Sequence, residues 1–149
     1  MLGTVCGGVD EAAEHCSVAF LDIGHVGQCN HHHGDAKGDD AFRQVARIIQ
    51  SVARRGDMLF RQGGEEIVVV PPGATRPEGL QAAERMRMAV EPAAIHHNAL
   101  PTAAVITVTV GVASPHGRDP VTVQLLMERA AGAAMQAKVQ ARRGQVHAA

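Results

Sequence analysis

Aromatic residues are scarce in this chain, which has three Phe and neither Trp nor Tyr among its 149 residues. Base stacking on aromatic side chains is a common way for proteins to bind single-stranded nucleic acids, so this scarcity argues against such a partner. Fourteen Lys and Arg against fifteen Asp and Glu leave a formal charge of −1, without the basic surplus that phosphate backbones or anionic lipids attract. The partners we expect are small molecules or a second copy of the chain.

Long apolar runs are also absent from the sequence. No uninterrupted apolar segment reaches the roughly 20 residues that a membrane-spanning helix needs, and residues 1–15 show no signal-peptide pattern. The three cysteines, Cys6, Cys16 and Cys29, are odd in number and lack C-x-x-C spacing, which predicts free thiols in a reducing compartment. We therefore expect a cytoplasmic protein with no membrane segment.

The secondary-structure pattern is that of one mixed domain. Apolar runs over 17–23 and 105–112 predict strands, and helical periodicity predicts helices over 39–55, 75–90 and about 119–141. Residues 57–62 and 65–70 form two more predicted strands around Gly63-Gly64, whose glycines accept the positive φ of a tight hairpin turn. This order predicts an α/β (α+β) fold, with a central, mostly antiparallel sheet and flanking helices.

Two carboxylates follow the glycine pair, and a third ends the first strand. The segment Arg61 to Ile67 reads RQGGEEI, and Leu21 to Gly24 reads LDIG. An acidic surface turn explains the first segment alone, and a helix N-cap explains Asp22 alone. Further blocks follow in order, TVTVG over 107–111 and AKVQAR over 137–142.

Taken together, these blocks resemble the GGDEF family of diguanylate cyclases over residues 17–146, while residues 1–16 remain an unassigned N-terminal segment. The resemblance implies a ferredoxin-like palm, as in other nucleotidyl cyclases, and an enzyme that condenses two GTP into cyclic di-GMP. It also implies Mg²⁺ (or Mn²⁺), held by Asp22, Glu65 and the main-chain carbonyl of Ile23, as hard cations prefer oxygen ligands. Glu66 belongs to the same signature, although strand alternation places its side chain opposite that of Glu65.

The substrate residues implied by the resemblance lie in four segments. Asn30 and Asp39 match the family's guanine readers. Gly63 and Gly64 provide a backbone without side chains that suits phosphate. Lys138 and Arg142, four residues apart on the last helix, suit the triphosphate. A turn asparagine, a capping aspartate and a solvated helix end explain the polar members equally well. The chemistry implies two subunits face to face, because each binds one GTP.

A separate R-x-x-D block is formed by Arg54 and Asp57, with Arg85 as an accessory arginine. In many members of the family this site binds the product, cyclic di-GMP, which then inhibits synthesis. A plain surface ion pair explains the same residues. The alternative function is therefore a degenerate domain that binds GTP or cyclic di-GMP without catalysis.

Four departures from the family pattern matter for activity. Gly24 replaces an aspartate, Gly27 a phosphate-contacting lysine, Asp35 a histidine and Ile67 a phenylalanine. Losing the lysine removes a charge-assisted hydrogen bond, commonly about 1.5 to 3 kcal/mol. We therefore expect an active but weakened enzyme.

A histidine-rich segment follows the first strand. His31, His32 and His33, with His25 and Cys29, could bind a transition metal, since imidazole and thiolate are suitable ligands. A solvated polar loop beside the substrate pocket is the simpler interpretation.

Overall fold

The computed structural model describes residues 16–24, 35–63, 65–95, 106–116, 121–140 and 144–149, with side chains from Asp40 onward in the second range. The described elements follow one another along the chain in this order: β1 (Val18–Ile23), α2 (Asp35–Val52), β2 (Met58–Arg61), β3 (Glu66–Val70), α3 (Arg76–Val90), the 3₁₀ turn η1 (Glu91–Ala93), β4 (Val108–Ala113), α4 (Val123–Val139) and β5 (Val146–Ala148).

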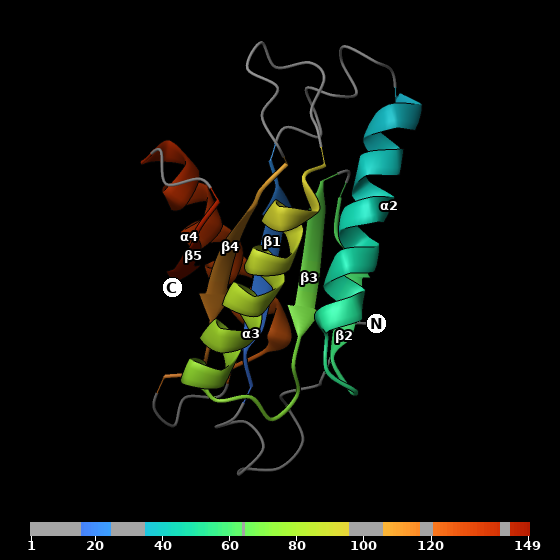
Figure 1. Cartoon of the computed structure of the whole chain (residues 1–149). Coiled ribbons are helices and arrows are strands. Elements are labelled where there is room, and N and C mark those ends of the chain that lie inside the picture. Colours follow the sequence, from blue (N-terminus) through green and yellow to red (C-terminus); the bar gives the residue numbers. More distant parts are fainter. Residues whose placement is uncertain (1–15, 25–34, 64, 96–105, 117–120, 141–143) are drawn as a thin grey trace.

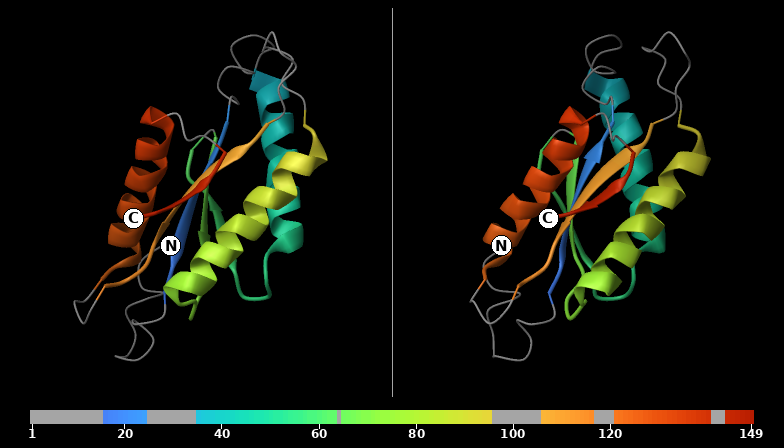
Figure 2. Two further views of the ribbon diagram at one scale, coloured as in Figure 1. Left: turned by 60° about the vertical axis from the view of Figure 1, so that its left-hand side comes forward. Right: turned by 90° about the vertical axis from the view of Figure 1, so that its left-hand side faces the viewer.

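The strands form one sheet in the order β2-β3-β1-β4-β5. β1 is central and antiparallel to both β3 and β4, while β5 runs parallel to β4. Helices α2 and α3 cover one face and α4 covers the other (Figures 1 and 2). All six residues of β1 are buried as a result. The predicted α/β fold, with a mostly antiparallel sheet between helices, is confirmed.

Alternation along the strands divides the core into two clusters. Odd-numbered residues of β1 and β3, such as Leu21 and Val69, pack against α2 and α3. Even-numbered residues, such as Phe20 and Val68, pack against α4. Because strand side chains alternate between faces, any residue in register with Phe20 or Val68 also faces α4. This rule places the functional side chains described below.

The predicted helix boundaries are close to those observed. Thr75 caps α3 with a capping box, in which its hydroxyl accepts from Glu78 N and the Glu78 carboxylate accepts from Thr75 N. Phe42, Val45 and Ile49 recur at helical spacing within the predicted 39–55 helix, and all three are buried. Helix α2 begins at residue 35 rather than 39, and α4 begins only after the Thr122 cap.

Two features differ from the sequence-based expectation. The short strand β5 was not predicted, since three residues give no periodicity signal. Cys16 was predicted to be a free thiol but is disulfide-bonded. An odd number of cysteines leaves one unpaired without preventing the other two from pairing. None of the described helices is both long and apolar enough to cross a bilayer.

Candidate functional site

The carboxylates of the two sequence motifs meet where β1 and β3 pair. Asp22 lies directly opposite Glu66 in the antiparallel register, and the amide of Ile23 donates to the carbonyl of Glu65 at 2.9 Å. Glu65 lies just before β3, so strand alternation does not fix its side chain. The backbone pairing therefore brings Asp22, Ile23, Glu65 and Glu66 to one corner of the sheet.

Asp22 faces α4, where it forms an ion pair with Lys138. The register places it between Glu66 on β3 and Thr109 on β4, and all three face the same helix. The Lys138 ammonium contacts Oδ2 of Asp22, whose side chain is only 9% exposed, against 23% for the lysine. A buried carboxylate requires a counter-charge because burial disfavours its ionised form. Lys138 provides that charge.

The electrostatics of Glu66 also indicate a crowded acidic corner. Its pKa is raised above the ordinary value, first by desolvation and then by the negative charges of Asp22 and Glu65. Lys138 acts in the opposite direction and lowers the pKa. Strand alternation puts Glu66 on the face of Asp22, so Glu66 and Asp22 act on each other directly.

The hairpin turn is held from two sides. A Cβ on Gly63 would approach Oε2 of Glu66 to 3.1 Å, so glycine leaves room for this carboxylate. Arg61 donates from Nε to the carbonyl of Gly63 at 3.0 Å, and its guanidinium lies 3.9 Å from the ring centroid of Phe42 on α2. This role of Arg61 was not predicted, and the only sequence signal for it is its position two residues before Gly63.

The corner has the chemistry that a hard divalent cation requires. Carboxylate oxygens of Asp22 and Glu66 face one side, and the ammonium of Lys138 already lies against one of them, so a cation is accommodated there. Among the described residues, no group of three or more His, Cys, Asp or Glu side chains is arranged as a complete metal site. A cation bound here would require further oxygen ligands beyond these two carboxylates.

Several predicted site residues lie outside the described part of the chain. Asn30, Gly64 and Arg142 belong to this group, and Asp39 is described only as a backbone position within α2. The histidine-rich segment with His25, Cys29 and His31–His33 also lies outside it. The guanine readers, the second turn glycine and the second basic residue remain predictions.

The R-x-x-D residues line a separate hollow of about 250 Å³ with Arg85. The amide of Arg54 donates to Oδ2 of Asp57 at 2.8 Å, which closes the turn before β2. Arg85 donates from Nε to the carbonyl of Val52 at 3.0 Å, while its buried Nη2 has no partner in the described structure. An unsatisfied buried guanidinium nitrogen is costly, so a ligand acceptor here would be favourable.

The four positions that were expected to depart from the family pattern have different structural settings. Ile67 is 3% exposed and packs in the core beneath α2 and α3, so its side chain contributes to packing. A Cβ on Gly24 would lie 3.2 Å from the carbonyl of Thr107, which accepts the Gly24 amide. Asp35 begins α2, and Gly27 lies outside the described residues.

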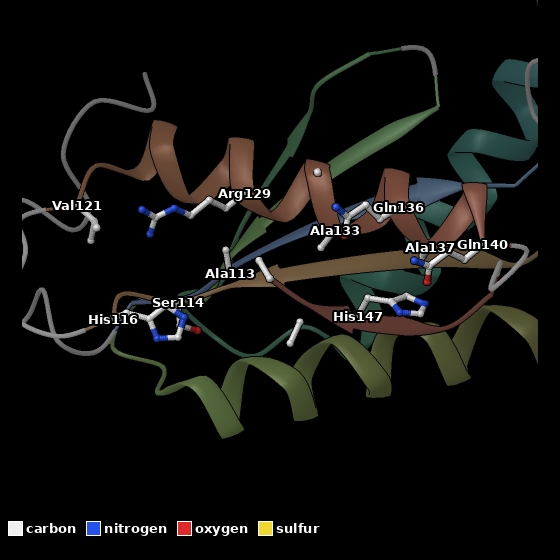
Figure 3. Close-up of a pocket in the computed structure, with 13 residues that line it drawn as sticks. Ala113, Ser114, His116, Val121, Arg129, Ala133, Gln136, Ala137, Gln140 and His147 are labelled. Carbon is white, nitrogen blue, oxygen red and sulfur yellow. The ribbon is translucent and has the colours of Figure 1, made fainter.

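A second hollow lies between α4 and β5 (Figure 3). It measures about 660 Å³ and is lined by Arg129, Gln136 and His147 over a floor of small residues. None of the predicted site residues whose side chains the structure describes lines it. It is therefore separate from the carboxylate corner.

Comparison with known proteins gives one family. The model described as "Diguanylate cyclase, GGDEF domain" matches residues 7–144. Diguanylate cyclase DgcM of Escherichia coli K12 is 34% identical over 109 residues, which are 73% of this chain and 25% of that protein. Diguanylate cyclase A of Treponema denticola is 31% identical over 128 residues, 86% of this chain and 34% of that protein. The chain thus spans only a quarter to a third of these relatives.

The fold also matches solved structures. The GGDEF domain of DgcB from Caulobacter crescentus, in complex with c-di-GMP, aligns with a TM-score of 0.82 and 28% identity. The alignment covers 99% of this chain and 85% of that domain. The GGDEF domain of PA1120 from Pseudomonas aeruginosa aligns with a TM-score of 0.80 and 26% identity, covering 99% and 90%.

Proposed function

Because the chain belongs to the diguanylate cyclase GGDEF domain family, we propose that it condenses two GTP molecules into cyclic di-GMP and releases two pyrophosphates. Each subunit would hold one GTP, so catalysis would take place between the two sites of a homodimer. GTP is a cytoplasmic metabolite, and we place the reaction in the cytoplasm.

The pairing of Asp22 with both Glu66 and Lys138 carries this proposal. The antiparallel register places the carboxylates of Asp22 and Glu66 side by side, and Lys138 reaches Asp22 from α4, which covers this face of the sheet. In an acidic surface turn the carboxylates would be exposed to solvent. Asp22 is only 7% exposed and is paired with a lysine, which argues against that interpretation. A carboxylate corner with one basic group fits a phosphate-bearing substrate that arrives with a divalent cation.

Each protein group has a distinct task in the proposed reaction. Asp22, the carbonyl of Ile23 and Glu65 would hold Mg²⁺, and Glu66 would add negative charge beside them. The metal supplies a lower pKa for the attacking 3′-hydroxyl and charge compensation for the departing pyrophosphate. Asn30 and Asp39 would accept and donate hydrogen bonds at the guanine edge.

The phosphates would be bound from two directions. Gly63 and Gly64 let them approach the backbone closely, and Lys138 with Arg142 would bind the triphosphate tail from α4. The resemblance implies that Gly27 stands where the family has a phosphate-contacting lysine. We propose that this loss weakens the grip on GTP by about one to two decades in affinity.

Incubation with GTP and Mg²⁺, with chromatographic separation of the nucleotides, tests the activity. We expect cyclic di-GMP, formed at a rate per subunit that rises with protein concentration as dimers assemble. The absence of product at high protein concentration would reject the proposal and leave the binding alternative.

A second function, binding of cyclic di-GMP, is favoured by the hollow around Arg54, Asp57 and Arg85. The buried Nη2 of Arg85 has no partner among the described residues, and Arg54 lines the same hollow. A guanine edge or phosphate could accept from both guanidinium groups. The proposed roles of this hollow are product inhibition in an active enzyme and sensing in an inactive one.

We expect Arg54→Ala to weaken cyclic di-GMP binding by about one to two decades, since one charge-assisted contact is commonly worth about 1.5 to 3 kcal/mol. Calorimetry with cyclic di-GMP measures the change. Arg43→Ala removes the same charge from an exposed position on α2 and is the control. Equal affinity of the Arg54 and Arg43 variants would exclude this hollow as the binding site.

A further inference from the structure

We propose that Lys138 is an exchangeable counter-ion, which neutralises Asp22 while no metal is bound and leaves it when a divalent cation arrives. The inference rests on the proposed function, because it assumes that the carboxylate corner binds the metal. It adds that Lys138 and the metal cation compete for the carboxylate of Asp22. Metal affinity would then be set partly by α4, outside the ligand set itself.

The ion pair has the geometry of a substitute cation. The Lys138 ammonium contacts Oδ2 of Asp22, the same carboxylate that is proposed to hold the metal. Glu66 lies opposite Asp22 across the β1–β3 pairing, so the lysine faces two neighbouring carboxylates. An ammonium ion and a dication that both contact this carboxylate repel each other, so binding of the dication weakens the contact with the lysine.

The Lys138 side chain is partly exposed and flexible, and it would have an alternative partner after displacement. Its side chain is 23% exposed, whereas Asp22 is fixed within the central strand by ladders on both sides. Lysine is a flexible stem with a compact charge, and it holds one acceptor less rigidly than an arginine fork would. A triphosphate bound at the same corner offers the displaced ammonium a new partner. Asp22 therefore has a positively charged partner both with and without the metal.

A permanent structural ion pair predicts the opposite behaviour. If Lys138 only supported the fold or the position of Asp22, its removal would disorder the corner and weaken metal binding. If it substitutes for the metal, its removal eliminates a competitor and strengthens binding of the metal alone. The sign of the change separates these two roles.

The test is a titration of the nucleotide-free protein with Mn²⁺, with the free ion followed by electron paramagnetic resonance. A neighbouring positive charge lowers the affinity of a carboxylate for a proton by about one to three decades, and it should lower the affinity for a metal cation in the same direction. We therefore expect Lys138→Met to bind Mn²⁺ at least about tenfold more tightly than the wild type. Lys138→Arg keeps the charge and should remain close to the wild type. Arg129→Met, a charge loss at an exposed position of the same helix, is the control.

A second titration uses Mn²⁺ with a non-hydrolysable GTP analogue. Here Lys138→Met should bind more weakly than the wild type, because it lacks a triphosphate contact. Tighter binding of the metal alone combined with weaker binding of the metal–nucleotide complex is the expected signature. Mn²⁺ binding to Lys138→Met that is equal to or weaker than wild-type binding overturns the proposal, as does an absence of Mn²⁺ binding in both proteins.

Folding of the variant is checked by circular dichroism in EDTA, and Lys138→Gln replaces Lys138→Met if the latter is unfolded. The wild type provides an independent readout, since the chain has only two lysines, Lys37 and Lys138. Reductive ¹³C-methylation retains their charge, and Mg²⁺ should shift the Lys138 signal without nucleotide; an unchanged signal contradicts the exchange. Neither readout requires turnover. A protein that shows the exchange but makes no cyclic di-GMP would refute the proposed cyclase and leave this inference intact.

Discussion

Asp22→Asn is expected to reduce the rate of cyclic di-GMP synthesis by more than about a hundredfold. Loss of a residue that only supports a metal ligand commonly lowers metal affinity or activity by about 10- to 100-fold, and Asp22 is proposed to be a ligand itself. Asparagine has nearly the same shape as aspartate but carries no negative charge. Asp22 is the central member of the row that joins Glu66, Asp22 and Thr109, and the only one paired with Lys138 in the described structure. The initial rate of product formation from GTP and Mg²⁺ measures the effect.

The matched control is Glu128→Gln, which makes the same carboxylate-to-amide change on α4. Glu128 is exposed and accepts a hydrogen bond from Gln124, away from the carboxylate corner. Its activity should equal that of the wild type. A folded Asp22→Asn protein with wild-type activity would rule out the metal role of Asp22.

Gly111→Ala should give the largest loss of stability. A Cβ at this position of β4 would lie 1.9 Å from the carbonyl oxygen of Ala130 and 2.8 Å from the amide nitrogen of Ala134. Both are backbone atoms of α4, so no side chain can move aside. Overpacking commonly costs about 1 to 3 kcal/mol, and a rigid backbone overlap places this variant at about 3 kcal/mol or more. Urea denaturation followed by circular dichroism measures the free energy of unfolding.

Gly132→Ala in α4 is the natural comparison. A Cβ there meets no atom within 4 Å, and alanine favours a helix over glycine by about 0.5 to 1 kcal/mol. This variant should unfold at a higher urea concentration than the wild type. An unfolding midpoint of Gly111→Ala equal to that of the wild type would show that α4 does not approach β4 this closely.

Local patterns in the sequence predicted most of the framework. The capping box at Thr75, the glycine pair before Glu65 and the periodicity of Phe42, Val45 and Ile49 each act within a few residues, so the sequence reveals them directly. Strand β5 depends on pairing with β4 and on no local signal, and it was missed. The disulfide of Cys16 is likewise a tertiary contact.

For the candidate site, the sequence indicated which residues to consider but not how they pair. Motif spacing identified Asp22 and Glu66, but only the register of β1 with β3 places them face to face. Lys138 was predicted to bind phosphate, and its contact with Asp22 arises because α4 crosses the face of β1. Asp22 and Lys138 lie more than a hundred positions apart, and Asp22 and Glu66 also lie on separate strands. Helical or strand periodicity carries no information about such contacts.

The most direct test of the proposed site is the position of the metal. Crystals grown with Mn²⁺ and a non-hydrolysable GTP analogue would locate the ion by its anomalous scattering. Our account predicts Mn²⁺ in contact with the carboxylates of both Asp22 and Glu65 and with the phosphates of the analogue. An ion bound elsewhere, or by neither carboxylate, would contradict it.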